Sequence, residues 1–313
     1  ILNDGQCMNR VIVVGCGLIG SSIAALIRKK KLANEVLGVD LESSLVRGKN
    51  QYFHNISNSL ENFGGADLLI IALPISEIPK LICYLGEDSR YKRFELITDV
   101  ASNKDPILES LLKMEKSDLL SMSERFVSSH PLAGSEKGGW KNANSSLLEE
   151  CIVLLGELHL NVETPVCGNL QQTSNKSERF KLLEDFWVNL GCSVVHFPIE
   201  EHDKLLSLIS HFPHFLAFST GQFLAASEYA DVAQSVYGPG LRDFTRIAEA
   251  PPDLWVNIFI KNRKHILEHA YLWRNNFENL VKALEKSDEQ ALQKVLEQSS
   301  HWRSRFSSIK KKS

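Results

Sequence analysis

The N-terminal two thirds of the chain alternate between short apolar runs and longer segments whose apolar residues recur with helical spacing. Apolar runs that lack a polar residue at every second position are typical of strands buried on both faces of a parallel sheet. The strand-like runs lie at residues 11–14, 35–39, 66–74, 95–100, 125–129, 151–155 and 192–196. The helix-like segments lie at residues 21–31, 76–85 and 177–190, and Asp105-Pro106 opens another. This alternation predicts an α/β fold with a mainly parallel sheet.

The strand pattern stops at Pro198, and the segments that follow are helical in period. Residues 200–229 form one such segment, with an interruption at residues 211–214. Pro251-Pro252 opens a second segment that reaches about Leu284, and Ser287 begins the last helix as part of a capping box.

A chain of 313 residues exceeds the usual size of a single core, so two domains are expected. We predict an N-terminal α/β domain at residues 1–197 and a C-terminal all-α domain at residues 198–313. Because the helices of this second domain are heavily apolar, we expect part of their surface to be buried against a second subunit in a homodimer.

The first strand runs directly into the glycine-rich turn Gly15-Cys-Gly-Leu-Ile-Gly20, and a helix follows. In a dinucleotide site the first glycine makes the turn, the second lets the pyrophosphate approach the helix N-terminus, and the third lets helix and strand pack closely. The context of a strand before the motif and a helix after it makes this signal specific. It predicts that the domain at residues 1–197 is a Rossmann-type dinucleotide-binding domain. The predicted cofactor-binding residues are Gly15, Gly17, Leu18, Ile19, Gly20, Asp40 and Pro74.

Asp40 ends the second predicted strand, 20 positions past Gly20. Its carboxylate would accept hydrogen bonds from the adenine ribose hydroxyls and repel a 2′-phosphate, which favours NAD over NADP. Arg47 and the serines at 43 and 44 keep NADP open as the alternative.

His130 follows the strand-like run 125–129 and begins the stretch His-Pro-Leu-Ala-Gly-Ser-Glu-Lys-Gly-Gly. Pro131 makes a helix directly after the strand unfavourable, and the glycines let the backbone turn sharply near a ligand. Ser135 and Glu136 bring a hydroxyl and a carboxylate within reach of that turn. The alternative is a tight surface loop whose histidine is only a satisfied polar residue.

Ligands of open α/β sheets bind beyond the carboxyl ends of the strands. Pro74, Ser102 and His130 all follow predicted strands, so we expect them to converge on the nicotinamide half of the site.

Polar residues of the helical half gather at 202–214 and 238–246. For His202, His211 and His214, helix-surface or capping roles are the alternative to a place in the site. Arg242 and Arg246 can lie on one helical face and bind a carboxylate, or they can pair with acids such as Asp243 or Glu249.

Composition excludes several classes of function. The net charge of −3 without a large basic block argues against nucleic acid, and no apolar run is long enough for a membrane helix. Six cysteines without C-x-x-C spacing indicate reduced thiols, neither a metal site nor a disulfide framework, so we expect a cytoplasmic protein. No signal or transit peptide is apparent, and Met8 resembles a natural start, which leaves residues 1–7 open between an extension and the end of an upstream domain.

Taken together, these motifs closely resemble the prephenate/arogenate dehydrogenases of tyrosine biosynthesis. The matching segments are Gly15–Gly20, Asp99–Lys104, His130–Lys137, His202-Asp203 with Ser210–His214, and Gly240–Ala248 with Trp255. The resemblance implies a Rossmann domain, a helical dimerisation domain and an active site between them. It further implies that His130 is the catalytic histidine, that Ser102 assists it, and that Arg246 binds a substrate carboxylate. With these we group Ser135, Glu136, His211, His214 and Arg242 as candidate substrate-binding residues.

The implied reaction acts on a cyclohexadiene that carries a hydroxyl at C4 and a carboxylate at C1. His130 takes the hydroxyl proton while the C4 hydride passes to NAD⁺, and loss of CO₂ makes the ring aromatic. A neutral histidine suits the role of base. Prephenate and arogenate share this ring, so either can be the substrate. The remaining alternatives are another NAD(P)-linked dehydrogenase, such as a β-hydroxyacid dehydrogenase, and a dinucleotide sensor without catalysis.

Overall fold

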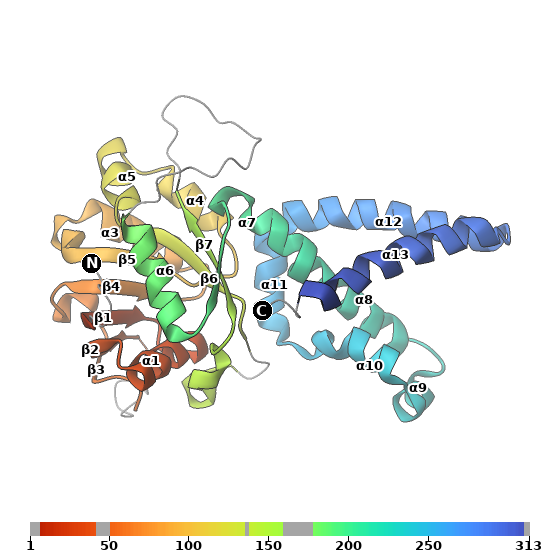
Figure 1. Ribbon diagram of the computed structural model, residues 1–313, viewed down its shortest axis with the longest axis horizontal. Coiled ribbons are helices and arrows are strands. Elements are labelled where there is room, and N and C mark those ends of the chain that lie inside the picture. The colour runs from red at the N-terminus through yellow and green to blue at the C-terminus, as the bar shows by residue number, and fades with distance from the viewer. Residues whose placement is uncertain (1–6, 42–50, 135–137, 159–177, 310–313) are drawn as a thin grey trace.

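The computed structural model describes residues 7–41, 51–134, 138–158 and 178–309. Figure 1 shows a sheet with helices on both of its faces and, beside it, a group of helices that extends away from the sheet. The described N-terminal part is thus of the α/β type and the C-terminal part is helical, as the sequence predicts.

The N-terminal part holds two small sheets. The first has the parallel order β3-β2-β1-β4-β5 and the second the order β6-β7-β8, in which β6 runs antiparallel to β7. A parallel bridge between Ile97 and Phe126 joins the sheets, so β6 runs in the direction of β5 and their carboxyl ends share one edge. The strands are β1 Met8–Val14, β2 Ala33–Val39, β3 Asn55–Ser57, β4 Ala66–Ile71, β5 Phe94–Asp99, β6 Val127–Pro131, β7 Ile152–Glu157 and β8 Ser193–His196.

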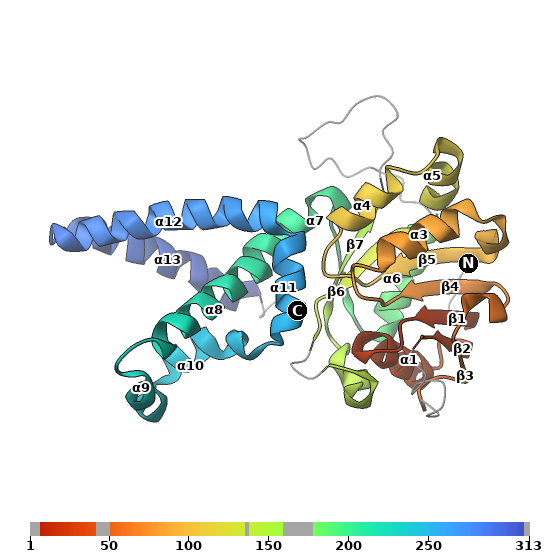
Figure 2. The same ribbon diagram turned by 180° about the vertical axis from the view of Figure 1, so that it is seen from behind.

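The continuous apolar strands are explained by cores on both faces of the first sheet. Val11 and Val13 belong to one core and Ile12 and Val14 to the other, because successive side chains of a strand point to opposite faces. Helices α1 Leu18–Lys30 and α6 Glu178–Leu190 cover the first face, whereas α3 Ile78–Glu87, α4 Asp105–Leu111 and α5 Lys116–Ser123 cover the other (Figures 1 and 2).

The C-terminal part consists of helices, and the last two form a hairpin that points away from the sheet (Figure 1). They are α7 Ile199–Leu206, a π-helical turn Ser207–His211, α8 Phe212–Ala225, α9 Ala230–Val236, α10 Pro239–Thr245, a 3-10 turn Arg246–Glu249, α11 Pro252–Lys261, α12 Arg263–Glu285 and α13 Glu289–Ile309.

Three details differ from the pattern-based expectation. The helix at residues 200–229 is not broken near Pro213 but widens into the π turn just before it, since a proline has no N–H for the helical ladder. The segment after Pro252 divides at Asn262 into α11 and α12. The last helix is capped by Asp288, whose carboxylate accepts from Ala291 N at 3.0 Å, because Ser287 has a left-handed φ of 52° at the end of the preceding helix.

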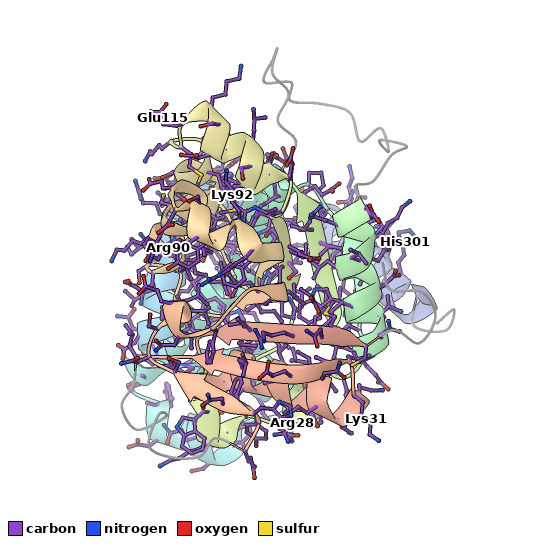
Figure 3. All side chains as sticks on the ribbon, turned by 90° about the vertical axis from the view of Figure 1, so that its left-hand side faces the viewer. Arg28, Lys31, Arg90, Lys92, Glu115 and His301 are labelled. Carbon is purple, nitrogen blue, oxygen red and sulfur yellow. The ribbon has the colours of Figure 1, made fainter. Side chains whose placement is uncertain are left out.

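On the face of the N-terminal part that points away from the helices of the C-terminal part, the labelled basic side chains do not form one patch (Figure 3). Figure 3 shows Arg28 and Lys31 at the end of α1, away from Arg90 and Lys92 of the 3-10 turn Ser89–Arg93. Among the described residues, no helix is long and apolar enough to cross a membrane.

Candidate active site

The glycine turn between β1 and α1 has the shape that a pyrophosphate requires. Gly15 has φ +96°, and a Cβ on it would lie 2.4 Å from the carbonyl oxygen of Ala72. A Cβ on Gly20 would lie 1.9 Å from the carbonyl oxygen of Gly15, so helix and strand pack there without room for a side chain. Gly17 differs, because no heavy atom of the described chain lies within 4 Å of its would-be Cβ. The backbone at the N-terminus of α1 is therefore accessible to an anion.

Asp40 stands directly after β2 and beside this turn. Its Oδ2 accepts a hydrogen bond from the backbone N of Cys16 at 2.8 Å, which fixes the carboxylate next to the glycines. Leu18 and Ile19 are half-buried at the start of α1, and Pro74 is exposed after β4. These positions fit a dinucleotide that lies along the carboxyl edge of the sheet. Arg47 and the serines at 43 and 44 lie outside the described residues.

His130 is the second-last residue of β6 and is only 7% exposed. The surface-loop alternative is therefore wrong for this histidine. Because β6 runs parallel to β5, His130 lies at the same sheet edge as Ser102, which is half-buried in the loop after β5. Ser135 and Glu136 fall outside the described residues, so their place in the site stays a prediction.

A row of buried hydrogen bonds leads from His130 into the helical part. His130 Nδ1 lies 2.9 Å from His202 Nε2, and His202 Nδ1 lies 2.8 Å from Asp203 Oδ1. Asp203 also accepts from the backbone N of Lys104 at 2.7 Å and of Asp105 at 3.0 Å. Helix α7 is thereby attached to the loop between β5 and α4.

The electrostatics of this row keep its imidazoles neutral. Burial lowers the pKa of His130 well below its usual range, and the neighbouring His202, Lys104 and His211 lower it further. Burial also lowers the pKa of His202, although the hydrogen bond with Asp203 works in the opposite direction. A neutral histidine has a lone pair that can accept a proton, which a catalytic base requires.

Lys104 is a buried cation beneath this row. Its Nζ pairs with the carboxylate of Asp99 and donates to the backbone oxygen of Ser129 at 2.9 Å. Burial lowers the pKa of the Lys104 ammonium, and Asp99 works to raise it. The Asp99 carboxylate further accepts from the hydroxyl of Ser128 at 2.7 Å, so the charges have hydrogen-bonded partners inside the protein.

The histidines of the helical part extend the cluster. His211 is 2% exposed, and Asn262 Nδ2 lies 2.8 Å from its Nδ1 and 2.7 Å from the backbone oxygen of Asp203. Burial lowers the pKa of His211 to about 4. His214 is half-buried and stacks on Trp255, with ring centroids 3.7 Å apart. A helix-surface role is therefore wrong for His202 and His211, and His214 packs against an aromatic wall.

The two arginines have different surroundings. Arg242 Nε lies 3.2 Å from Asp243 Oδ1, so the ion-pair alternative is confirmed for this residue. Arg246 is exposed and makes no ion pair within the described parts of the chain. Burial lowers the pKa of His214, and the nearby Arg246 lowers it further, which places the guanidinium on the histidine side of the helical part.

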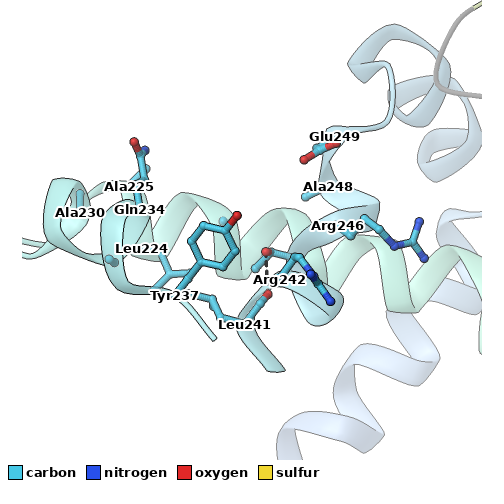
Figure 4. A pocket seen from close by; sticks show the side chains of 13 residues that line it. Leu224, Ala225, Ala230, Gln234, Tyr237, Leu241, Arg242, Arg246, Ala248 and Glu249 are labelled. Carbon is cyan, nitrogen blue, oxygen red and sulfur yellow. Dashed lines mark hydrogen bonds between the residues drawn. The ribbon is translucent and has the colours of Figure 1, made fainter. Parts of the chain in front are cut away.

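Both arginines also line a cavity of about 460 Å³ between α8, α9, α10 and the 3-10 turn, together with Tyr237, Thr245 and Glu249. Figure 4 shows their guanidinium groups on neighbouring turns of the chain. The arrangement offers Arg246 for a carboxylate, while Arg242 is already occupied by its neighbour.

The sequence does not indicate the hydrogen bonds that join several of these residues. His202 and Asp203 belong to a matching segment, yet the contact of His202 with His130 spans 72 positions and the hydrogen bond of Asp203 with Lys104 spans 99, and no local pattern indicates them. Asn262 gave no signal, because a single asparagine between two helical segments is common.

Two family models match the chain. The model described as "Prephenate dehydrogenase, nucleotide-binding domain" matches residues 23–195, and "Prephenate dehydrogenase, dimerization domain" matches residues 198–298.

Curated relatives named prephenate dehydrogenase include one from Lactococcus lactis subsp. cremoris, which is 29% identical over 297 residues, or 93% of this chain and 75% of the relative. Another, from Bacillus subtilis, is 29% identical over 292 residues, or 92% of this chain and 73% of the relative. The solved structure of prephenate dehydrogenase from A. aeolicus in complex with hydroxyphenyl propionate and NAD⁺ has a TM-score of 0.77 at 23% identity, covering 96% of this chain and 99% of that one. This likeness confirms the predicted fold.

Proposed function

The chain belongs to the prephenate dehydrogenase family, and we propose that it catalyses the NAD-dependent oxidative decarboxylation of prephenate to 4-hydroxyphenylpyruvate in tyrosine biosynthesis. The single observation that carries the proposal is His130, a buried and neutral histidine at the same sheet edge as the glycine turn. A base that remains unprotonated at neutral pH is what the removal of a hydroxyl proton needs.

Each residue of the cluster has a role in this reaction. His130 takes the proton of the C4 hydroxyl, and Ser102 donates a hydrogen bond to the same hydroxyl or orients His130. Arg246 binds a carboxylate of the substrate, and His214 on its Trp255 platform forms the adjoining wall. Arg246 comes from the helical part and His130 from the sheet, so the substrate is held between the two.

The residues at the glycine turn fit NAD. The open space at Gly17 admits the pyrophosphate, and the fixed carboxylate of Asp40 receives the ribose hydroxyls. When bound, NAD⁺ supplies the acceptor for the hydride that leaves the ring. Asp40 also disfavours the 2′-phosphate of NADP through like-charge repulsion.

The test is an assay of NADH formation with prephenate, and separately with arogenate, each with NAD⁺ and with NADP⁺. The proposal expects NADH with prephenate and NAD⁺. Arogenate is the alternative substrate because it shares the reacting ring, and a higher kcat/KM with arogenate would replace prephenate in the proposal. A protein that binds NAD⁺ but forms no NADH with either substrate would be a sensor and not an enzyme.

We further propose a homodimer formed through the C-terminal helices. In the single chain, α12 leaves large apolar side chains exposed, among them Tyr271, Leu272, Trp273 and Phe277. Exposed apolar surface of this extent is typical of protein interfaces. Sedimentation equilibrium should give twice the chain mass, and Trp273→Glu should shift the protein toward the monomer.

We also infer a cytoplasmic location and a domain boundary between residues 197 and 198. The five described cysteines are free thiols, which suits a reducing compartment. The boundary is supported by the end of β8 at His196 and the start of α7 at Ile199.

A further inference from the structure

We propose that Asp203 and His202 are positioning residues that set the tautomer of His130, so that its Nε2 lone pair faces the substrate only while helix α7 is attached to the loop between β5 and α4. The inference rests on the proposed role of His130 as base. It concerns how the buried row of hydrogen bonds keeps that base in the tautomer that can accept a proton.

Asp203 is the fixed end of the row. It is completely buried and accepts hydrogen bonds from His202 Nδ1 and from the backbone N–H groups of Lys104 and Asp105. Burial alone would raise the pKa of this carboxyl, but the hydrogen bonds from His202 and from the two backbone groups outweigh it, and the net shift is downward. Asp203 is therefore an ionised carboxylate, which can only accept.

The proton positions along the rest of the row follow from this carboxylate. Because Asp203 only accepts, His202 must have its proton on Nδ1. His202 is neutral, so its Nε2 has no proton and accepts in turn. Across the 2.9 Å contact, His130 must then donate from Nδ1, which leaves the lone pair of His130 on Nε2. The carboxylate of Asp203 thus imposes, through His202, the tautomer of His130 that a base needs.

The same carboxylate holds the two parts of the protein together. Its partners Lys104 and Asp105 belong to the sheet part, whereas Asp203 belongs to α7 of the helical part. Asn262 of the α11–α12 junction donates to the backbone oxygen of Asp203 and fixes it from the other side. A separation of the two parts would release Asp203 and, with it, the proton order of both imidazoles.

The first experiment exchanges the carboxylate for an amide of the same shape. In Asp203→Asn, we expect the amide oxygen to keep the hydrogen bond from Asp105 N, so that the NH₂ takes the place of Oδ1, gives up the hydrogen bond from Lys104 N and donates to His202 Nδ1. This reverses both tautomers and places the proton of His130 on Nε2. We expect kcat to fall roughly 10²–10⁴-fold, as comparable Asp→Asn exchanges do beside catalytic histidines, with KM for NAD nearly unchanged. Asp185→Asn, at an exposed carboxylate of α6, is the matched control and should keep wild-type kcat.

The decisive readout is the ¹⁵N chemical shift of the His130 imidazole, which reports the protonated nitrogen without any substrate. The proposal expects an unprotonated Nε2 in the wild type and a protonated Nε2 in Asp203→Asn. An unchanged tautomer in Asp203→Asn would overturn the proposal even if kcat falls, because the loss would then be structural.

A second pair of variants covers the case in which Asp203→Asn does not fold. In His202→Gln the amide oxygen can accept from His130 Nδ1, whereas His202→Leu of similar size cannot. Gln should retain at least about tenfold more kcat than Leu, roughly the worth of one hydrogen bond. Equal losses in the two variants would overturn the proposal.

The proposed function fails separately from this inference. If the wild type forms no NADH, or if His130→Asn keeps full activity, the role of His130 as base is wrong, and the ¹⁵N shift still decides whether Asp203 sets its tautomer.

Discussion

The buried histidine row (His130, His202 and Asp203) and the exposed arginine turn (the 3-10 turn that begins at Arg246) differ in what surrounds their polar groups. His130, His202 and Asp203 are 7%, 3% and 0% exposed, and their hydrogen-bond partners are protein groups. Arg246, by contrast, is exposed and has no ion-pair partner within the described parts of the chain. The comparison indicates that the proton-transferring groups of the row are hydrogen-bonded in place before the substrate arrives. The guanidinium of Arg246, by contrast, stays hydrated until a substrate carboxylate binds to it. Mutations in the row should therefore change kcat, and mutations in the turn should change KM.

The largest expected effect is that of His130→Asn, which removes the base from the row. Loss of general acid–base catalysis typically lowers the rate by about 10²–10⁴-fold. We expect this loss in kcat, with the affinity for NAD nearly unchanged because the glycine turn lies on another strand. Steady-state kinetics and a titration with NAD⁺ measure the two quantities. Activity within a few fold of the wild type would remove His130 from the mechanism.

Arg246→Ala tests whether the exposed arginine turn binds the carboxylate of the substrate. The loss of a charge-assisted pair costs about 1.5–3 kcal/mol, or roughly 10- to 150-fold in binding. We expect this as a raised KM for prephenate, with KM for NAD nearly unchanged and only partial recovery in Arg246→Lys, since an ammonium cannot form the bidentate fork.

Arg242→Ala is the matched control for this prediction, because that arginine already pairs with Asp243. It should change KM for prephenate by much less than Arg246→Ala. If Arg246→Ala lowers the melting temperature and leaves the KM of prephenate at the wild-type value, then Arg246 stabilises its own turn and the comparison fails.

The buried histidines should make stability depend on pH, whereas the arginine turn should not. The pKa of His211 is lowered to about 4 in the folded protein, so between that value and about 6.5 the unfolded chain binds more protons. His211 therefore contributes fully above about pH 6.5 and loses about 1.4 kcal/mol per pH unit as the pH falls through this window.

Urea unfolding at about pH 7 and about pH 5 measures this slope. His211→Gln should reduce it by about 1.4 kcal/mol per unit, and His301→Gln at an exposed site should leave it as it is. An unchanged slope in His211→Gln would show that this histidine is not held neutral.

The smallest expected effect concerns the cofactor. Asp40→Ala removes the acceptor for the ribose hydroxyls and the repulsion of a 2′-phosphate, so KM for NAD should rise about tenfold while KM for NADP falls. Assays with both cofactors measure the ratio. A wild-type enzyme that already prefers NADP would contradict the role of Asp40.

The sequence predicts best those features that a local backbone constraint imposes. Gly15 and Gly20 were recognised because their spacing between a strand and a helix is unusual, and the structure leaves no room for a Cβ at either. The division into a sheet part and a helical part was equally readable from the period of apolar residues. The apolar run before His130 likewise predicts its position at a strand end, and His130 is the second-last residue of β6.

The features that the sequence could not predict depend on contacts between distant segments. The pairing of His130 with His202 across 72 positions arises from the packing of α7 against the sheet, which no spacing rule contains. The antiparallel direction of β7 relative to β6 was also missed, since buried strands have the same composition in either direction. Arg242 and Arg246 differ for a local reason instead, because Arg242 pairs with the adjacent Asp243, which the sequence already offers as an alternative.

The π-helical turn at Ser207–His211 determines the angular phase of the helix that contains both site histidines. At about 100° per residue, the nine positions from His202 to His211 would span about two and a half turns of a regular α-helix and put the two rings on opposite sides. The π turn absorbs one extra residue, which leaves an offset of only about 80°. Both rings therefore face the Asp203 and Asn262 side of the cluster. A single deletion in this turn would therefore return it to a regular α-helix and keep the offset near 80°, whereas a further insertion that no second π turn absorbs would rotate His211 away from the site with every side chain intact.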